Sequence, residues 1–289
     1  MTQPEITGHT RVVGVIAHPV EHTLSPPMHN AEFRRLGLDW VYVPWDVLPE
    51  NLPAAVNGLR ALGVAGFNVT IPHKQAIMPL LDRIEYEAEV IGAVNTVTCT
   101  GGVLTGFNTD LFGWQEDIQQ DISLEGRAVC LIGVGGAARA VTVGAYRAGA
   151  PRLVLVHRPA DADQAQALAA HLREKCRGAE VETASLDSSA CRDLVRSCEV
   201  VVNATPVGMA SSPGIPIPAD WLHPDQYLYD VIYTPAETEL MRAARAAGCR
   251  ARGGLGMLAR QGAMAFKLWT GTAPDPLAME ATLRQRLGL

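Results

Sequence analysis

Small residues follow one another closely in the run Gly133-Val-Gly135-Gly-Ala-Ala138, between an apolar stretch and an alanine-rich one. Glycine at the first position permits a tight turn, glycine at the third lets the backbone approach a ligand, and Ala138 lets a helix pack closely on a strand. The free N–H groups and the dipole at a helix N-terminus favour a phosphate group there. The spacing therefore predicts a loop that binds the pyrophosphate of a dinucleotide through Gly133, Gly135, Gly136 and Ala137. A loop tightened only for packing is the alternative interpretation.

The tripeptide His157-Arg158-Pro159 stands where the next predicted strand ends. Sites for NAD usually place Asp or Glu there, ~20 residues after the glycines, to hold the ribose 2′-hydroxyl group. The planar fork of an arginine instead suits a 2′-phosphate group, which it can bind through two parallel hydrogen bonds. We therefore predict NADP, bound by His157 and Arg158. NAD stays open because Asp161 and Asp163 are close in sequence, and a solvated arginine without a ligand is the other interpretation.

Polar clusters occur at four places in the first 110 residues, each where a strand is expected to end. In extended chain alternate residues share a face, so Asn68 and Thr70 should point the same way. Each cluster alone has a simpler explanation, because Ser25 before a proline can cap a helix and Asn, Thr and Asp favour turns. Ligands of open α/β sheets bind at the carboxyl ends of strands, so the repeated placement favours a binding site. The clusters are Thr23-Leu-Ser25, Asn68-Val-Thr70 with Lys74 after it, Asn95-Thr96 and Asn108-Thr-Asp110.

The segments that would position these residues alternate between short β-branched runs and longer Ala- and Leu-rich runs. That alternation predicts βαβ units and parallel sheets covered on both faces. The predicted strands are Val12–Ala17, Trp40–Val43, Gly66–Val69, Ala93–Cys99, Ala128–Ile132, Leu153–His157, Val200–Asn203 and Tyr227–Val231. The predicted helices are Pro27–Leu36, Leu52–Leu62, Ala137–Ala148, Asp163–Lys175, Glu237–Ala247 and Met257–Thr270. A second α/β part should begin after Asp110–Gly126, with another crossing near Gly253-Gly254.

Composition excludes several classes of protein. The 289 residues suffice for about two domains, and 24 basic against 30 acidic side chains, interspersed along the chain, leave no basic patch for nucleic acid. No apolar run approaches the ~20 residues that span a bilayer, so we expect no membrane segment. Six scattered cysteines are typical of reduced thiols in a cytoplasmic protein. Met1–Thr10 lacks the pattern of a signal peptide, and His18 and His22 have no partners that would complete a metal site.

Taken together, these segments resemble the shikimate dehydrogenase family over nearly the whole chain. The motifs that carry the resemblance are Thr23–Asn30, Gly66–Lys74, Gly92–Thr96, Gly106–Asp110, Gly133–Ala138, Asn203–Met209 and Gly254–Gln261. The resemblance implies an α/β fold with two domains. An N-terminal α/β substrate domain with a mostly parallel sheet would comprise residues 1–110 and 255–289. A Rossmann-like, doubly wound NAD(P)-binding domain would comprise residues 111–254.

The resemblance also implies a role for each matching residue. Lys74 and Asp110 would be the catalytic pair. The substrate would be bound by Thr23 and Ser25 at its carboxylate and by Asn68, Thr70, Asn95 and Gln261 at its hydroxyl groups, with Tyr233 nearby. Thr205 and Met209 would line the nicotinamide pocket, with Gly254 also contributing to cofactor binding. The elementary chemistry agrees, because reduction of a ketone needs a hydride on carbon and a proton on oxygen, which a lysine can donate.

The implied activity is the NADP-dependent, reversible reduction of 3-dehydroshikimate to shikimate in the cytoplasm, on the route to chorismate and the aromatic amino acids. A quinate or aminoshikimate-type dehydrogenase that uses NAD or NADP is the alternative, followed by a non-catalytic dinucleotide-sensing module. The expected partner is a small hydroxylated carboxylic acid, with no nucleic acid, membrane or metal, in a monomer or homodimer. Three positions depart from the family pattern: Thr23 replaces serine, Ala162 replaces a second basic residue, and Leu111 replaces glycine.

Overall fold

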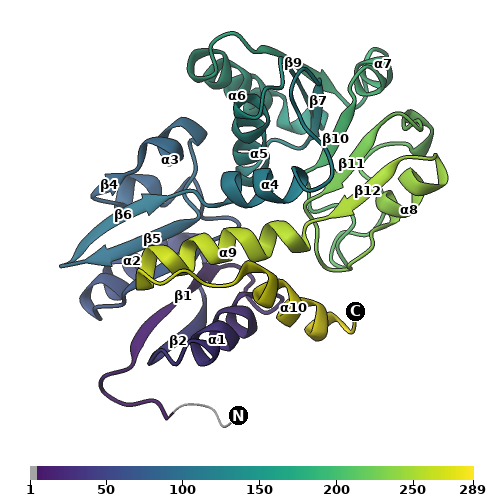
Figure 1. Ribbon diagram of the computed structural model, residues 1–289. Helices are drawn as coiled ribbons and strands as arrows, with labels where there is room; N and C mark the ends of the chain where they lie inside the picture. Colours follow the sequence, from purple (N-terminus) through teal and green to yellow (C-terminus); the bar gives the residue numbers. More distant parts are fainter. Residues whose placement is uncertain (1–4) are drawn as a thin grey trace. The chain divides into compact units, whose positions relative to one another are not determined.

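The computed structural model describes residues 5–289, so the first four residues of the Met1–Thr10 segment, for which the sequence predicts no signal peptide, lie outside the described part. The chain divides into two compact units (Figure 1). One contains the residues up to Gly113 together with Ala259–Leu289, and the other contains Trp114–Leu258. Within residues 5–289, no helix is long and apolar enough to cross a membrane.

The first unit is built on a six-stranded mixed sheet. Its strands are β1 (Arg11–Ala17), β2 (Trp40–Asp46), β3 (Gly66–Val69), β4 (Arg83–Ile84), β5 (Thr96–Thr100) and β6 (Val103–Phe107). They lie in the order β2-β1-β3-β5-β6-β4. Strand β1 pairs in parallel with β2 and β3, whereas β5 is antiparallel to both β3 and β6. The parallel strands β1 and β3 therefore end at the same edge, where β5 begins.

Helices from both ends of the sequence belong to this unit. They are α1 (Ser25–Arg35), α2 (Leu52–Ala61), α3 (Tyr86–Ile91), most of α9 (Leu255–Thr270) and α10 (Pro276–Leu287). Helix α2 buries Leu52, Val56 and Leu59, the spacing of one helical face, against the sheet core. Helix α10 lies along α1, so the end of the chain packs on its beginning (Figure 1).

An aromatic cluster surrounds a buried histidine in the first unit. The His29 ring stacks on Tyr42 with ring centroids 4.5 Å apart, and Phe266 and Trp269 pack nearby. Neither ring nitrogen of His29 has a hydrogen-bond partner among the described residues. Burial lowers the pKa of His29 to about 3, because the charged form has no compensating partner. The ring is therefore neutral at physiological pH and acts as an aromatic core residue.

The second unit contains a fully parallel six-stranded sheet. Its strands are β7 (Val129–Ile132), β8 (Arg152–His157), β9 (Glu180–Ser185), β10 (Val200–Asn203), β11 (Tyr227–Asp230) and β12 (Arg250–Gly253). Their spatial order is β12-β11-β10-β7-β8-β9. Read from the β9 edge, with β7 numbered as the first strand, this order is 3-2-1-4-5-6. That order defines a doubly wound dinucleotide-binding sheet with its topological switch point between β7 and β10. The predicted α/β fold class is confirmed.

The helices of this unit are α5 (Gly136–Arg147), α6 (Ala162–Lys175), α7 (Cys191–Arg196) and α8 (Glu239–Ala246). Thr238 caps α8, because its side chain accepts a hydrogen bond from the Met241 N–H. The unit also contains the last part of α4 (Asp110–Ile118) and the first part of α9. Both boundaries between the units therefore fall inside helices. All six cysteines are unpaired, and only Cys99 is not buried.

Candidate active site

Lys74 and Asp110 form an ion pair in the first unit. Lys74 follows β3 after a turn, and Asp110 is the first residue of α4. The Lys74 Nζ donates to Asp110 Oδ2 over 2.6 Å, and the two side chains are 14% and 8% exposed. A carboxylate in the first turn of a helix is stabilised by the helix dipole. The two residues lie 36 positions apart in the sequence. They meet because Lys74 follows β3 and Asp110 follows β6, and these two strands end at the same edge of the sheet.

Asn95 connects this ion pair to the rest of the site. Its amide nitrogen donates to Asp110 Oδ1 over 2.8 Å and to Thr109 Oγ1 over 3.0 Å. Its amide oxygen accepts from the Thr109 N–H over 2.7 Å and from the Thr96 hydroxyl over 3.0 Å. The Asp110 carboxylate is therefore held at one oxygen by Asn95 and at the other by Lys74. Such a network fixes the direction in which the lysine ammonium group points.

Gln261 reaches the same network from α9. Its side-chain oxygen lies 3.3 Å from Thr109 Oγ1 and 3.5 Å from Asn95 Nδ2. Gln261 is 166 residues from Asn95, and its position explains how the C-terminal segment completes the first unit. The structure thus brings together four of the predicted residues: Lys74, Asp110, Asn95 and Gln261.

Asn68 lies beside this cluster on β3. Its oxygen accepts from the Tyr42 hydroxyl over 2.7 Å, and its nitrogen donates to Thr96 Oγ1 over 3.0 Å and to the Asn95 carbonyl over 3.2 Å. These contacts fix which way the Asn68 amide faces. Tyr42 is itself held by its stacking on His29. Sequence reasoning did not assign a role to Tyr42, because a tyrosine in a predicted strand is indistinguishable from a core residue.

Three hydroxyl groups that follow β1 and β3 make few or no hydrogen bonds within the described residues. Ser25 is the first residue of α1, so it does not cap the helix, and no described side chain caps α1. The capping role considered for Ser25 was therefore wrong. Thr23 Oγ1 accepts only the Ser25 N–H, over 3.3 Å. Among residues 5–289, the Ser25 and Thr70 hydroxyls have no hydrogen-bond partner, which leaves them available to a ligand.

The glycine loop lies between β7 and α5 in the second unit. Gly133 has φ of +107°, which L-residues with a side chain rarely adopt. A Cβ atom at Gly133 would lie 2.9 Å from Thr205 Cγ2, whereas one at Gly135 would meet nothing within 4 Å. The backbone at Gly135 is therefore open, as required where a pyrophosphate approaches Gly136 and Ala137 at the start of α5. Packing alone explains the glycine at position 133 and leaves the one at 135 unexplained.

The segment after β10 lies on the other side of the topological switch point. Asn203 Oδ1 accepts the Thr205 N–H over 3.0 Å and the Thr205 hydroxyl over 2.7 Å. Asn203 Nδ2 donates to Asp230 Oδ1 over 3.0 Å and to the Val207 carbonyl over 3.1 Å. The turn that carries Thr205 and continues to Met209 is thus fixed from within. Burial raises the pKa of Asp230 to about 6, although three hydrogen bonds to its carboxylate oppose the shift.

At the end of β8, Arg158 is exposed but already paired. Its guanidinium group donates to both carboxylate oxygens of Asp161, over 2.7 and 3.1 Å, while 71% of its side chain is exposed. The pair holds the pKa of Asp161 below its ordinary value. His157 Nδ1 lies 2.8 Å from the Arg158 carbonyl oxygen. A 2′-phosphate group would have to compete with Asp161 for the arginine.

Two further predicted residues lie in the second unit. Tyr233 follows β11, and burial raises the pKa of its hydroxyl group. Gly254 lies directly against the Val231 carbonyl group, so a side chain at this position would collide with backbone. Packing thus explains Gly254 without a ligand. Neither residue belongs to the unit that contains Lys74 and Asp110.

Comparison with known proteins identifies relatives along the whole chain. A family model described as the shikimate dehydrogenase substrate binding domain matches residues 15–97, and one described as the shikimate 5′-dehydrogenase C-terminal domain matches residues 254–284. The NADP(+) shikimate dehydrogenase of Citrifermentans bemidjiense is 47% identical over 284 residues, which cover 98% of this chain and 97% of the relative.

Solved structures show the same similarity. A shikimate dehydrogenase in complex with NADP+ aligns with a TM-score of 0.90 at 39% identity, covering 98% of each chain. A shikimate 5-dehydrogenase from Listeria monocytogenes, in complex with shikimate and NAD, aligns with a TM-score of 0.88 at 35% identity, covering 98% of this chain and 99% of the other. The likeness therefore includes both units, and relatives of this fold bind either form of the dinucleotide.

Proposed function

Because this chain belongs to the shikimate dehydrogenase family of NAD(P)-dependent oxidoreductases, we propose that it reversibly reduces 3-dehydroshikimate to shikimate with NADP. The first unit is the substrate-binding and catalytic domain, and the second is the cofactor domain. The largely buried Lys74–Asp110 ion pair is the observation that supports this proposal most directly. A dinucleotide-sensing module without turnover would have no need for this pair.

The substrate groups match the polar groups of the first unit. The free hydroxyl of Ser25, with Thr23 beside it, can donate hydrogen bonds to a carboxylate at the start of α1. The free Thr70 hydroxyl, Asn68, Asn95 and Gln261 offer donors and acceptors suited to the hydroxyl groups of a polyol ring. We propose that Tyr233 contributes a further hydroxyl group to substrate binding.

The proton transfer is assigned to Lys74. During reduction, Nζ donates a proton to the carbonyl oxygen as the hydride reaches the carbonyl carbon. In the reverse direction, Nζ takes the proton from the substrate hydroxyl group. Asp110 accepts a hydrogen bond from Nζ and, through Asn95, keeps a fixed position. Asp110 therefore orients the ammonium group towards the reacting oxygen.

We assign NADP binding to three parts of the second unit. Gly133, Gly135, Gly136 and Ala137 would bind the pyrophosphate, His157 and Arg158 the adenosine end, and Thr205, Met209 and Gly254 the nicotinamide end. The open backbone at Gly135 is the observation that favours a bound group, since no protein atom fills that space. When bound, NADPH supplies the hydride. The unpaired cysteines support a cytoplasmic location for the enzyme.

The first test of this function is a matrix of initial rates. Shikimate and quinate are each oxidised with NADP and with NAD, and the nicotinamide absorbance is followed. We expect the highest kcat/KM with shikimate and NADP. A preference for quinate would instead identify the protein as a quinate dehydrogenase, the alternative activity. Thr23, whose methyl group departs from the family serine, would then be the residue to change back to serine. No turnover with any pair would contradict an enzymatic function.

Removal of the Arg158 side chain should weaken the binding of NADP more than that of NAD. In Arg158→Ala, we expect the KM for NADP to rise about tenfold or more, because a charge-assisted pair with the 2′-phosphate is lost. The KM for NAD should change less than twofold, since NAD lacks that phosphate. Arg177→Ala, another arginine of the cofactor unit, serves as the control. Equal losses with both cofactors would show that Arg158 does not recognise the 2′-phosphate.

A further inference from the structure

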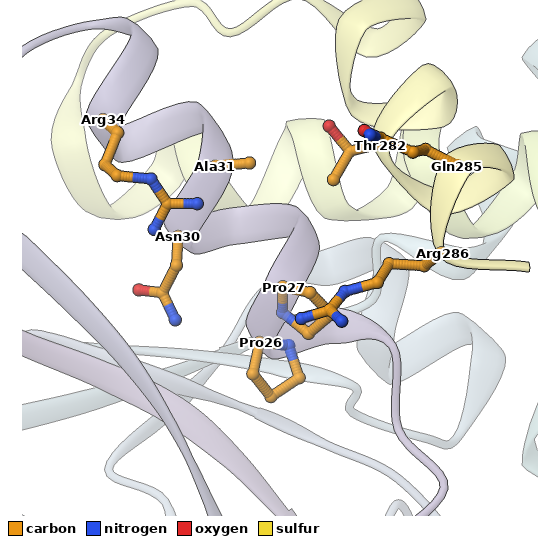
Figure 2. A pocket seen from close by; sticks show the side chains of 8 residues that line it. All are labelled: Pro26, Pro27, Asn30, Ala31, Arg34, Thr282, Gln285 and Arg286. Atoms are coloured by element: carbon orange, nitrogen blue, oxygen red, sulfur yellow. The ribbon is translucent and has the colours of Figure 1, made fainter. Parts of the chain in front are cut away.

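A hollow on the surface of the first unit lies between α1 and α10 and has a volume of about 650 Å³. Volumes of this order are typical of small-ligand sites. Its walls come from one face of each helix, at positions spaced three and four residues apart. The lining residues are Pro26, Pro27, Asn30, Ala31 and Arg34 of α1 and Thr282, Gln285 and Arg286 of α10 (Figure 2). None of the residues predicted to bind substrate or cofactor lines it.

Two unpaired arginines give this hollow its charge. Arg34 on α1 and Arg286 on α10 both line the hollow (Figure 2). Within residues 5–289, neither guanidinium group has a hydrogen bond or ion pair. Their neighbours on the same helices differ, because Arg35 pairs with Glu32 and Arg284 pairs with Glu280. Of the four arginines on these two helices, only the two that line the hollow are unpaired within the described part of the chain.

The surroundings of the arginines are positive and partly apolar. Among the described residues that line the hollow, none is acidic, although the chain as a whole has a net charge of −6. Asn30 is not free to move, because its amide group makes two 2.8 Å hydrogen bonds to the backbone of Tyr42. The rings of Pro26 and Pro27 and the Ala31 methyl group form a rigid apolar wall. Helix dipoles favour arginine in the last turn of α1 and α10 but do not explain why no carboxylate accompanies either one.

We propose that this hollow is a binding site for a small phosphate monoester with a ring or other apolar body. A phosphate monoester, whose charge approaches −2 at neutral pH, would be attracted by the two guanidinium charges that line the hollow. Arginine binds phosphate oxygens through its planar fork, and the proline wall would contact the apolar body. The site lies on the Pro26–Pro27 turn, directly after Ser25, on a surface that the proposed reaction does not use.

Calorimetric titration with phenyl phosphate tests the site. The whole chain is first saturated with NADPH and shikimate, so that the proposed cofactor and substrate sites cannot take up the probe. We expect one saturable site, weakened about tenfold or more in Arg34→Gln and in Arg286→Gln. Arg284→Gln, which removes a charge from the same helix outside the hollow, should bind like the unaltered chain. Inorganic phosphate should bind several-fold more weakly, because it lacks the apolar body.

The other outcomes overturn the proposal. Absence of saturable binding would do so, as would binding that Arg34→Gln and Arg286→Gln leave intact. An equal loss in Arg284→Gln would show attraction by general charge, and equal affinity for inorganic phosphate would contradict the monoester assignment. If NADPH or shikimate fails to bind, the proposed function fails. The same series of variants titrated without ligands then still tests the hollow, because Arg34 and Arg286 are absent from the proposed active site.

Discussion

Replacing Lys74 with alanine should lower kcat for shikimate oxidation by about 10²- to 10⁴-fold, the range that general acid–base catalysis contributes. The reason is local: Nζ is the only charged donor that the described structure shows at Asp110, so its removal leaves the reacting oxygen without a proton donor. The KM for NADP should change less than twofold, because the glycine loop belongs to the other unit. Initial rates with varied shikimate and varied NADP measure both quantities.

Controls distinguish lost chemistry from lost structure. Lys267→Ala removes an exposed lysine of α9 and should leave kcat unchanged. Lys74→Met keeps the aliphatic stem and should be as inactive as Lys74→Ala. In the double variant with Asp110→Asn, kcat should fall little further than in Lys74→Ala, because the two side chains act as a unit. A Lys74→Ala enzyme with unaltered kcat would remove Lys74 from the mechanism, and a fully additive double variant would contradict the shared role.

Residues whose roles depend on local sequence can be assigned from the sequence alone. The glycine loop and the polar clusters at strand ends have short-range signatures, because turn geometry and strand periodicity depend on near neighbours. The contact between Lys74 and Asp110 does not follow from spacing, since it depends on the order of strands in the sheet. Thr109 was visible only as part of a motif, although it contacts both Asn95 and Gln261.

Other features escaped prediction for identifiable reasons. Strands β9 and β12 were not predicted, because both are edge strands with polar sequences, and edge strands need no continuous apolar run. The sequence shows that Asp161 is close to Arg158 but does not predict their ion pair. Whether the two side chains meet depends on the turn between β8 and α6. Leu111, which departs from the family glycine, is completely buried and fills core space in α4.

Asp117 is the residue whose loss should destabilise the second unit most. Its side chain is 0% exposed and accepts hydrogen bonds from the Tyr229 hydroxyl over 2.8 Å and from Arg252 over 3.0 and 2.8 Å. Arg252 also pairs with Asp121 at 3.0 Å. A glycine is required at position 256, because a side chain there would collide with the Asp117 carboxylate. Asp117 thus ties the end of α4 to β11, β12 and the first turn of α9.

Asp117→Ala should lower the free energy of unfolding of this unit by about 3–5 kcal/mol, the cost of breaking a buried ion pair from one side. The substitution leaves the Tyr229 hydroxyl and part of the Arg252 guanidinium group buried without their partner. Native-state hydrogen exchange of the β11 and β12 amides measures this local stability, since the two units need not unfold together. Asp225→Ala, an exposed carboxylate in the same unit, should change it by less than about 0.5 kcal/mol.

The partner substitution completes the argument. If the ion pair is the cause, Arg252→Ala combined with Asp117→Ala should cost less than the sum of the single variants, with a coupling of about 0.5–3 kcal/mol. If the losses of unfolding free energy in the two single variants are additive, the destabilisation comes from altered packing of the α4 segment rather than from the lost ion pair. Because Asp110 begins α4 and Asp117 lies in its last turn, the same variants also test whether catalysis depends on this anchor. Unaltered kcat in Asp117→Ala would show that Lys74, Asn95 and the N-terminal turn of α4 suffice to position Asp110.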